Sequence, residues 1–211
     1  MKLGTPPILK LLILTVVIMA PLMSNASLIV TPGNQPLPNE QNVLFTPNQA
    51  GNTVNGLTDI THSMVSFSAP VMLSTTGNGV SPAQTSDVIH DLTITAAGTF
   101  TDLILNPQVP NGPGGGPWDL TILLNTNAGQ LSYTFPTSGS GALGNGNNFI
   151  TFEVTGGILI SSVELLSTSG FDGLTQTRIS GLQAVNAPEP ASLLLLGAGL
   201  SALSFRRRRL S

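Results

Sequence analysis

Between residues 27 and 187 the hydrophobic positions of the chain follow no helical period. Short β-branched and aromatic runs recur instead, separated by Gly, Pro, Asn and Asp, which is the pattern of strands and turns. The strands expected from these runs are 42–46, 64–69, 71–74, 88–96, 100–105, 118–126, 130–135, 149–155, 158–166 and 175–185. About ten short strands without crossover helices predict an all-β fold, an antiparallel β-sandwich of jelly-roll or Greek-key type.

The strand-breaking and turn-forming residues between these strands add detail to the prediction. Pro70 is expected to separate two strands, and Gly181 to break the last one. The Gly- and Pro-rich residues 111–117 and the Ser-, Gly- and Asn-rich residues 138–148 are expected to be loops. Three strand pairs have the spacing of hairpins: 88–96 with 100–105, 118–126 with 130–135, and 149–155 with 158–166.

The first 26 residues have the three-part layout of a secretory signal peptide. Lys2 and Lys10 precede the apolar run 11–23, and Ser24-Asn25-Ala26 offers small residues to signal peptidase. The alternative is an uncleaved anchor, but the run is short for a membrane span. Cleavage is therefore expected after Ala26.

The last residues form a second separate segment. Pro188-Glu189-Pro190 forbids further strand pairing, residues 191–205 form an uncharged apolar stretch, and Arg206, Arg207, Arg208 and Arg209 follow it. As a helix, this stretch would rise about 22 Å, less than the roughly 30 Å of bilayer hydrocarbon. It is thus a marginal transmembrane helix, suited to temporary retention. Because arginine resists insertion, the cluster is expected to stay cytoplasmic with the domain outside. The alternative, a buried terminal helix of the domain, is hard to reconcile with four consecutive arginines.

Pro188-Glu189-Pro190, the apolar stretch and the arginine cluster together resemble the PEP-CTERM sorting signal of exported bacterial proteins. The resemblance covers about the last tenth of the chain. It implies recognition by exosortase, a membrane transpeptidase, and removal of the tail during export. Residues 44–54 and 171–182 also resemble domains found ahead of such tails, and no function comes with that likeness.

Charge and cysteine content narrow the function of residues 27–187. Nine acids against the single cation Arg178 leave a formal charge of −8, which excludes nucleic-acid binding. Arg178 is expected to pair with a nearby carboxylate. The chain has no cysteine, so disulfides and Cys-ligated zinc are excluded. A domain of this length can still bury about two-thirds of its unfolded surface.

Few residues of the domain suggest chemistry. His90 with Asp87 and Asp91 could form a metal site or an acid–base pair, although a solvated strand end is the simpler interpretation. Asp59, Asp172 and the loop 144–148 offer oxygen ligands for calcium, but their spacing matches no known calcium loop. We expect no resident cofactor.

Catalytic motifs are equally sparse. The sequence has no Gly-x-Ser-x-Gly elbow, and its carboxylates form no recognisable glycosidase pair. Trp118 and Tyr133 are the aromatic candidates for sugar stacking, with a core position more typical of Trp118. Three functions remain. The favoured one is a non-enzymatic protein of the cell surface or exopolysaccharide layer; the others are a glycan-binding module and a secreted hydrolase.

Overall fold

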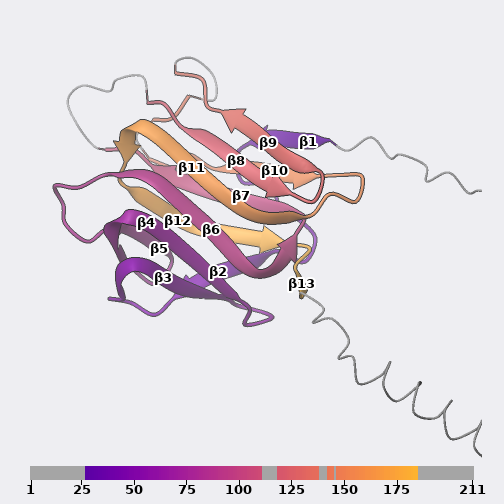
Figure 1. Ribbon diagram of the computed structural model, residues 1–211, viewed down its shortest axis with the longest axis horizontal. Coiled ribbons are helices and arrows are strands. Elements are labelled where there is room, and N and C mark those ends of the chain that lie inside the picture. The colour runs from indigo at the N-terminus through magenta and orange to yellow at the C-terminus, as the bar shows by residue number, and fades with distance from the viewer. Residues whose placement is uncertain (1–26, 111–117, 138–141, 145, 185–211) are drawn as a thin grey trace, which may run out of the picture.

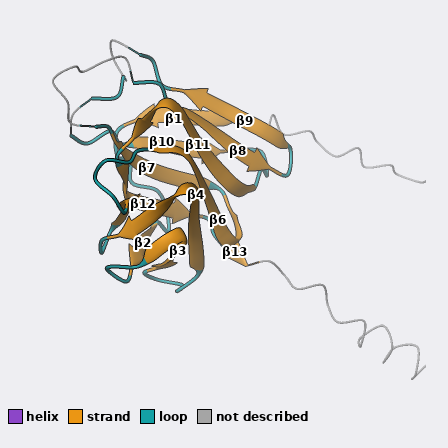
Figure 2. Cartoon of the chain, turned by 60° about the vertical axis from the view of Figure 1, so that its left-hand side comes forward, coloured by secondary structure: helices purple, strands orange, loops and turns teal. Residues whose placement is uncertain are grey.

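The computed structural model describes residues 27–110, 118–137, 142–144 and 146–184 (Figures 1 and 2). The predicted signal peptide, the sorting tail and their two predicted helices lie outside these residues. The described residues form thirteen strands and no helix. The strands are β1 (Leu28–Pro32), β2 (Gln41–Phe45), β3 (Ala50–Thr58), β4 (Met64–Thr75), β5 (Gly79–Pro82), β6 (Ile89–Phe100), β7 (Asp102–Gln108), β8 (Thr121–Thr126), β9 (Gly129–Thr134), β10 (Ile150–Val154), β11 (Ile160–Phe171), β12 (Gly173–Ser180) and β13 (Gln183–Ala184).

Every strand pair is antiparallel, and the pairing follows the path β1-β10-β7-β12-β2-β3-β4-β6-β11-β8-β9. β5 bonds to both β4 and β12, and β13 bonds to β6. The prediction of an all-β antiparallel fold is therefore confirmed. Its division into two stacked sheets of jelly-roll type stays a prediction.

One hydrophobic core lies inside this curved array. Alternation places one face of each strand inward, as in β2, where Val43 and Phe45 are buried and Leu44 is exposed. The rings of Tyr133 on β9 and Phe152 on β10 meet edge to face with centroids 5.8 Å apart. Because β9 and β10 lie near opposite ends of the pairing path, the array must curl around the core. Figure 1 shows the same closure, with β8 and β9 beside β10.

Of the three predicted hairpins, one is confirmed. β8 and β9 pair from Thr121↔Thr134 to Thr126↔Gly129 across the expected turn. The other two are wrong, because β10 pairs with β1 and β7 whereas β11 pairs with β6 and β8, and β6 and β7 do not pair with each other. In both cases the chain leaves one part of the array for another. Thr101 alone connects β6 to β7, and the connection from β10 to β11 contains Gly156 and Gly157, so a short connection does not by itself make a hairpin.

The predicted break at Pro70 is also wrong, because β4 runs through it. The ladder between β3 and β4 is irregular from Gly51↔Leu73 to Thr53↔Ser68, which leaves Pro70 in a bulge where no ladder donor is needed. The side-chain amide of Asn52 donates to the carbonyls of Ala69 and Pro70 instead. The sequence patterns also missed β1, β3 and β5. The predicted break at Gly181 is confirmed, since β12 ends at Ser180 and β13 begins at Gln183.

Candidate functional site

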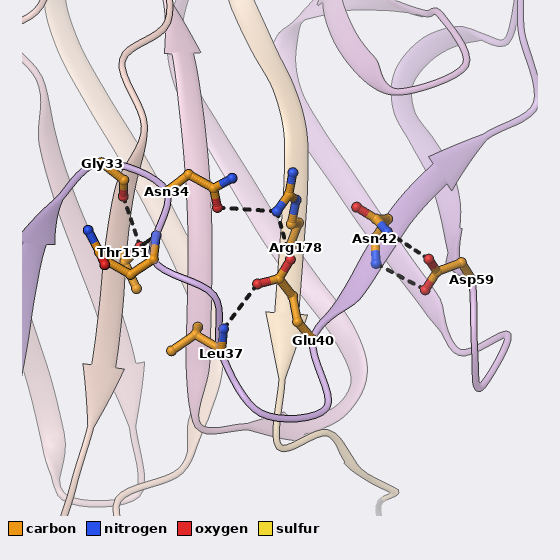
Figure 3. A network of polar contacts seen from close by, with 9 residues as sticks. Gly33, Asn34, Leu37, Glu40, Asn42, Asp59, Thr151 and Arg178 are labelled. Carbon is orange, nitrogen blue, oxygen red and sulfur yellow. Dashed lines mark hydrogen bonds and ion pairs between the residues drawn. The ribbon is translucent and has the colours of Figure 1, made fainter.

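The clearest polar cluster surrounds Arg178 on β12 (Figure 3). Its Nη1 lies 2.7 Å from Oε1 of Glu40 and donates to Oδ1 of Asn34 at 3.2 Å. The other oxygen of Glu40 accepts from the backbone N of Leu37 at 3.2 Å. The two charged side chains are only 21% and 18% exposed. The predicted pairing of Arg178 with a carboxylate is confirmed.

This cluster fastens the segment between β1 and β2 to the rest of the domain. Beside the ion pair, Thr151 on β10 donates from Oγ1 to the carbonyl of Gly33 at 3.0 Å and accepts from the backbone N of Gln35 at 3.2 Å. Arg178 Nε is buried, and no described residue accepts a hydrogen bond from it. The arrangement binds two chain segments together.

Asp59, a predicted calcium ligand, uses both carboxylate oxygens within the protein (Figure 3). Asn42 donates its backbone N to Oδ1 at 3.0 Å and its side-chain Nδ2 to Oδ2 at 2.7 Å. In the loop 144–148, Asn148 donates its side chain to the carbonyls of Pro107 and Gly144, each at 2.9 Å. Within the described part of the chain, no three His, Cys, Asp or Glu side chains converge in a way that could hold a metal ion. Calcium stays a prediction.

His90 contacts a backbone group instead of forming a site with Asp87 and Asp91. Its Nδ1 lies 3.0 Å from the carbonyl oxygen of Ser167 on β11. That carbonyl belongs to an irregular stretch of β11, because the register with β6 shifts between Leu166 and Phe171. His90 therefore contacts the bulge that residues 167–170 form in β11.

Asp119 is a second carboxylate on the same bulge, and the sequence patterns did not single it out. Its Oδ2 accepts from the backbone N and Oγ1 of Thr168 at 2.8 and 2.7 Å, and its Oδ1 accepts from the backbone N of Ser169 at 3.0 Å. The hydroxyl of Ser169 also donates to Oδ1. This last bond and the three from Thr168 and the Ser169 backbone hold the pKa of the carboxyl well below its usual range, against an opposing desolvation effect. The run of donors Ser167-Thr168-Ser169 was the available sequence signal.

A small hollow lies between β9 and the segment leading into β10. Its volume is about 240 Å³, and its walls include Tyr133, Phe135, Phe149, Asn147 and Asn148. This volume is below the roughly 300–1,000 Å³ of pockets for drug-sized ligands. Trp118, the other predicted stacking residue, is half-buried and packs against the core, as is more typical of this residue type.

The predicted processing residues Ala26, Pro188, Glu189, Pro190 and Arg206 to Arg209 all lie outside the described residues. The described chain ends in β13, where Gln183 and Ala184 pair with Thr99 and Gly98 of β6. Among the described residues, no helix has both the length and the apolar character needed to cross a membrane.

Comparison with protein families shows what the tail is. A family model described as the PEP-CTERM protein-sorting motif matches residues 186–209. The chain carries a PEP-CTERM sorting motif. It is thus an exported protein, sorted through exosortase and routed to the cell envelope. The match covers the Pro-Glu-Pro motif, the apolar stretch and the arginine cluster, and it does not identify the family of the β domain. No curated protein and no solved structure matches this chain.

Proposed function

We propose that this PEP-CTERM protein is a non-enzymatic component of the cell surface or exopolysaccharide layer. The observation that carries the proposal is that three of the domain's carboxylates are engaged in contacts within the fold. Glu40 pairs with Arg178, Asp59 binds Asn42, and Asp119 binds Thr168 and Ser169. Each of these contacts joins segments of the fold, so these carboxylates serve structure.

The exposed strand faces support the same role. Hydroxyl pairs bridge neighbouring strands, with Thr53 to Ser68 at 2.9 Å and Thr121 to Thr134 at 3.0 Å. Such hydroxyl-bearing surfaces remain hydrated, which suits a protein embedded in hydrated polysaccharide. The excess of acids over the single arginine keeps the domain soluble by mutual repulsion.

We also propose a route to that location. Signal peptidase cuts after Ala26, and the apolar stretch 191–205 then holds the precursor in the inner membrane with the domain outside. Exosortase recognises Pro188-Glu189-Pro190 and removes the tail, which frees the domain for the outer surface or matrix. The proposal rests on the marginal length of the stretch and on the cost of inserting the cluster Arg206 to Arg209.

Two structural details belong to this proposal. The contact between Tyr133 and Phe152 supports a jelly-roll-type sandwich, because it brings together β9 and β10, which lie near opposite ends of the pairing path. The proposed role needs no resident cofactor. Calorimetry on the purified protein tests whether calcium binds at Asp172 or at the loop 144–148.

The second candidate is a glycan-binding module, and the hollow beside Tyr133 favours it. Aromatic Phe149 and the amides of Asn147 and Asn148 line the same space. A glycan array probed with the mature protein tests this candidate. Binding that Asn147→Ala abolishes and Trp118→Ala retains would place the glycan in the hollow, and no binding to any glycan would remove the candidate.

Fractionation of matched hosts tests the favoured function. In a host with exosortase, the mature protein should be found with the outer surface or the extracellular matrix, and in a host lacking exosortase the precursor should accumulate in the inner membrane. Extracted exopolysaccharide should retain the mature protein in a sedimentation assay. Hydrolysis of envelope polysaccharide or peptide by the pure protein, lost in His90→Ala, would contradict the proposal in favour of a hydrolase.

A further inference from the structure

Three neighbouring strands expose a row of large apolar side chains. Leu44 on β2 is the register partner of Leu57 on β3, which is in turn the partner of Met64 on β4. These side chains are 47%, 50% and 48% exposed, and Ile60 in the turn between β3 and β4 is 64% exposed. We call these four residues the apolar row.

The apolar row is confined to one end of the three strands. Further along the same outer face, β3 presents Thr53 and Asn55, and β4 presents Ser66 and Ser68. These polar side chains hydrogen-bond across the strands, Thr53 to Ser68 and Ser66 to Asn55. Solvent-exposed sheet faces are normally polar, so a contiguous apolar segment marks a surface that contacts something.

The apolar row lies close to the point where the described chain ends. Ala184 of β13 pairs with Gly98 of β6, and Val65, next to Met64, pairs with Ala96 of the same strand. Strands lie about 5 Å apart and two residues span about 7 Å, so Ala184 is within roughly 12 Å of Val65. Figures 1 and 2 both show β13 beside the end of β6.

The sequence beyond Ala184 brings a membrane segment into reach. The seven residue steps from Ala184 to Ala191, where the apolar stretch 191–205 begins, span at most about 25 Å. A domain tethered by so short a linker keeps the end that carries β13 near the bilayer. The tether also raises the effective concentration of that end at the lipid surface, so that even a small apolar contact is populated.

We propose that the apolar row rests on the lipid bilayer while the stretch 191–205 is inserted in it. The contact orients the domain so that Pro188-Glu189-Pro190 is presented at the membrane surface, where exosortase acts. This inference rests on the transient anchoring proposed above. Partly exposed Leu, Ile and Met side chains enter the interface between headgroups and acyl chains. The row contains no cation, so the contact is apolar and does not depend on anionic lipid.

A second copy of the chain fits the apolar row less well. Stable interfaces bury about 800 Å² per partner, far more than four half-exposed side chains provide. The position of the row beside the tail also has no explanation in a dimer. A fold-back of the chain's own apolar stretch onto the row is the remaining alternative, and the experiment separates it.

The natural absence of cysteine makes a direct test available. The full-length chain is reconstituted into phosphatidylcholine vesicles that contain a lipid-attached quencher, with a fluorophore on one introduced cysteine. Met64→Cys probes the apolar row. Met72→Cys is the matched control, because Met72 lies on the outer face of the same strand, is 51% exposed, and is eight residues, or roughly 26 Å, away. Leu195→Cys reports insertion of the tail.

We expect quenching at Met64→Cys several times stronger than at Met72→Cys, and strong quenching at Leu195→Cys. Adding Leu44→Ser and Leu57→Ser should remove the difference between the two methionine positions without lowering the unfolding temperature. Equal, weak quenching at both methionines with Leu195→Cys quenched would overturn the lipid contact alone. An unquenched Leu195→Cys would overturn the anchoring as well, and so would a Met64→Cys probe that is shielded from water without quencher contact, the result expected of a fold-back.

Discussion

Arg178 and Glu40 are joined by an ion pair, with Nη1 and Oε1 2.7 Å apart, although 138 residues separate them in the chain. The contact fixes the segment that leads from β1 into β2 against β12, near the middle of the pairing path. Because Arg178 is the single cation between residues 27 and 187, no other residue of that region can replace it.

Glu40→Gln should lower the free energy of unfolding by about 1–2 kcal/mol. The range lies between that of exposed and buried pairs, because both side chains are about four-fifths buried. Urea denaturation of the mature domain measures the change. Asp172→Asn serves as the control, since no described residue donates a hydrogen bond to the Asp172 carboxylate and the substitution should change stability little. Equal effects of the two substitutions would contradict a specific role for the ion pair.

The carboxylate of Asp119 should make the domain acid-sensitive. Its pKa in the folded protein lies well below the usual value of about 3.9, chiefly because the Ser169 hydroxyl donates to it. A lowered pKa stabilises the fold fully above the unfolded pKa, and this contribution is lost as pH falls below about 4. Asp119→Asn should therefore lower stability at pH 7, and the difference from wild type should shrink at pH 2–3. Thermal unfolding across this pH range measures it, and a constant difference would contradict the assignment.

Gly170→Ala should destabilise the bulge that Asp119 holds. Gly170 has φ +79°, and an added Cβ would lie 2.4 Å from Cγ2 of Val88. Strain and overpacking together should cost about 2–4 kcal/mol. Gly157→Ala is the matched control, because Gly157 has a similar φ of +77° and no described atom within 4 Å of the added Cβ. Its cost should be about 1 kcal/mol. Comparable losses in the two variants would show that the contact with Val88 is unimportant.

Processing at both ends should be visible by mass spectrometry of the protein from a host with exosortase. The first peptide should begin at Ser27, and no peptide should extend beyond about Pro190. Replacing Arg206 to Arg209 with asparagine should remove the stop to translocation, so that the tail is retained on the exported protein. A mature wild-type protein that still contains Arg206 to Arg209 would contradict this processing.

Local signals in the sequence predicted local pairing and failed where partners are distant. The turn Asn127-Ala128-Gly129 identified the β8–β9 hairpin because both strands adjoin it. Gly156-Gly157 gave the same signal, yet β10 takes β1 and β7 as partners, and those contacts depend on burial along its whole length. β3 was missed because its Asn and Gly residues have low strand propensity, and because its two large apolar residues, Val54 and Leu57, lie on opposite faces of the strand and give no alternating hydrophobic pattern.

The polar contacts were likewise predictable only where they depend on local sequence. That Arg178 pairs with a carboxylate was predictable because it is the lone cation among nine acids, but the choice of Glu40 among those acids was not. Asp119 became recognisable once the bulge of β11 turned the backbone N–H groups of Thr168 and Ser169 toward it. The sorting motif was predictable because it works as a linear sequence and needs no tertiary contact.

The pairing of β1 with β10 sets the order in which an exported chain can fold. β1 begins two residues after the predicted signal-peptide cleavage site, yet its partner residues 150–154 lie more than a hundred positions later. The strand that reaches the far side of the membrane first must therefore wait, unpaired, until most of the domain has been translocated. β13 is the last described strand to arrive, and it closes onto β6 next to the residues that lead into the sorting motif. Every described strand therefore precedes the sorting motif in the chain, and a chain exported from its N-terminus delivers all the partners of the fold before the motif.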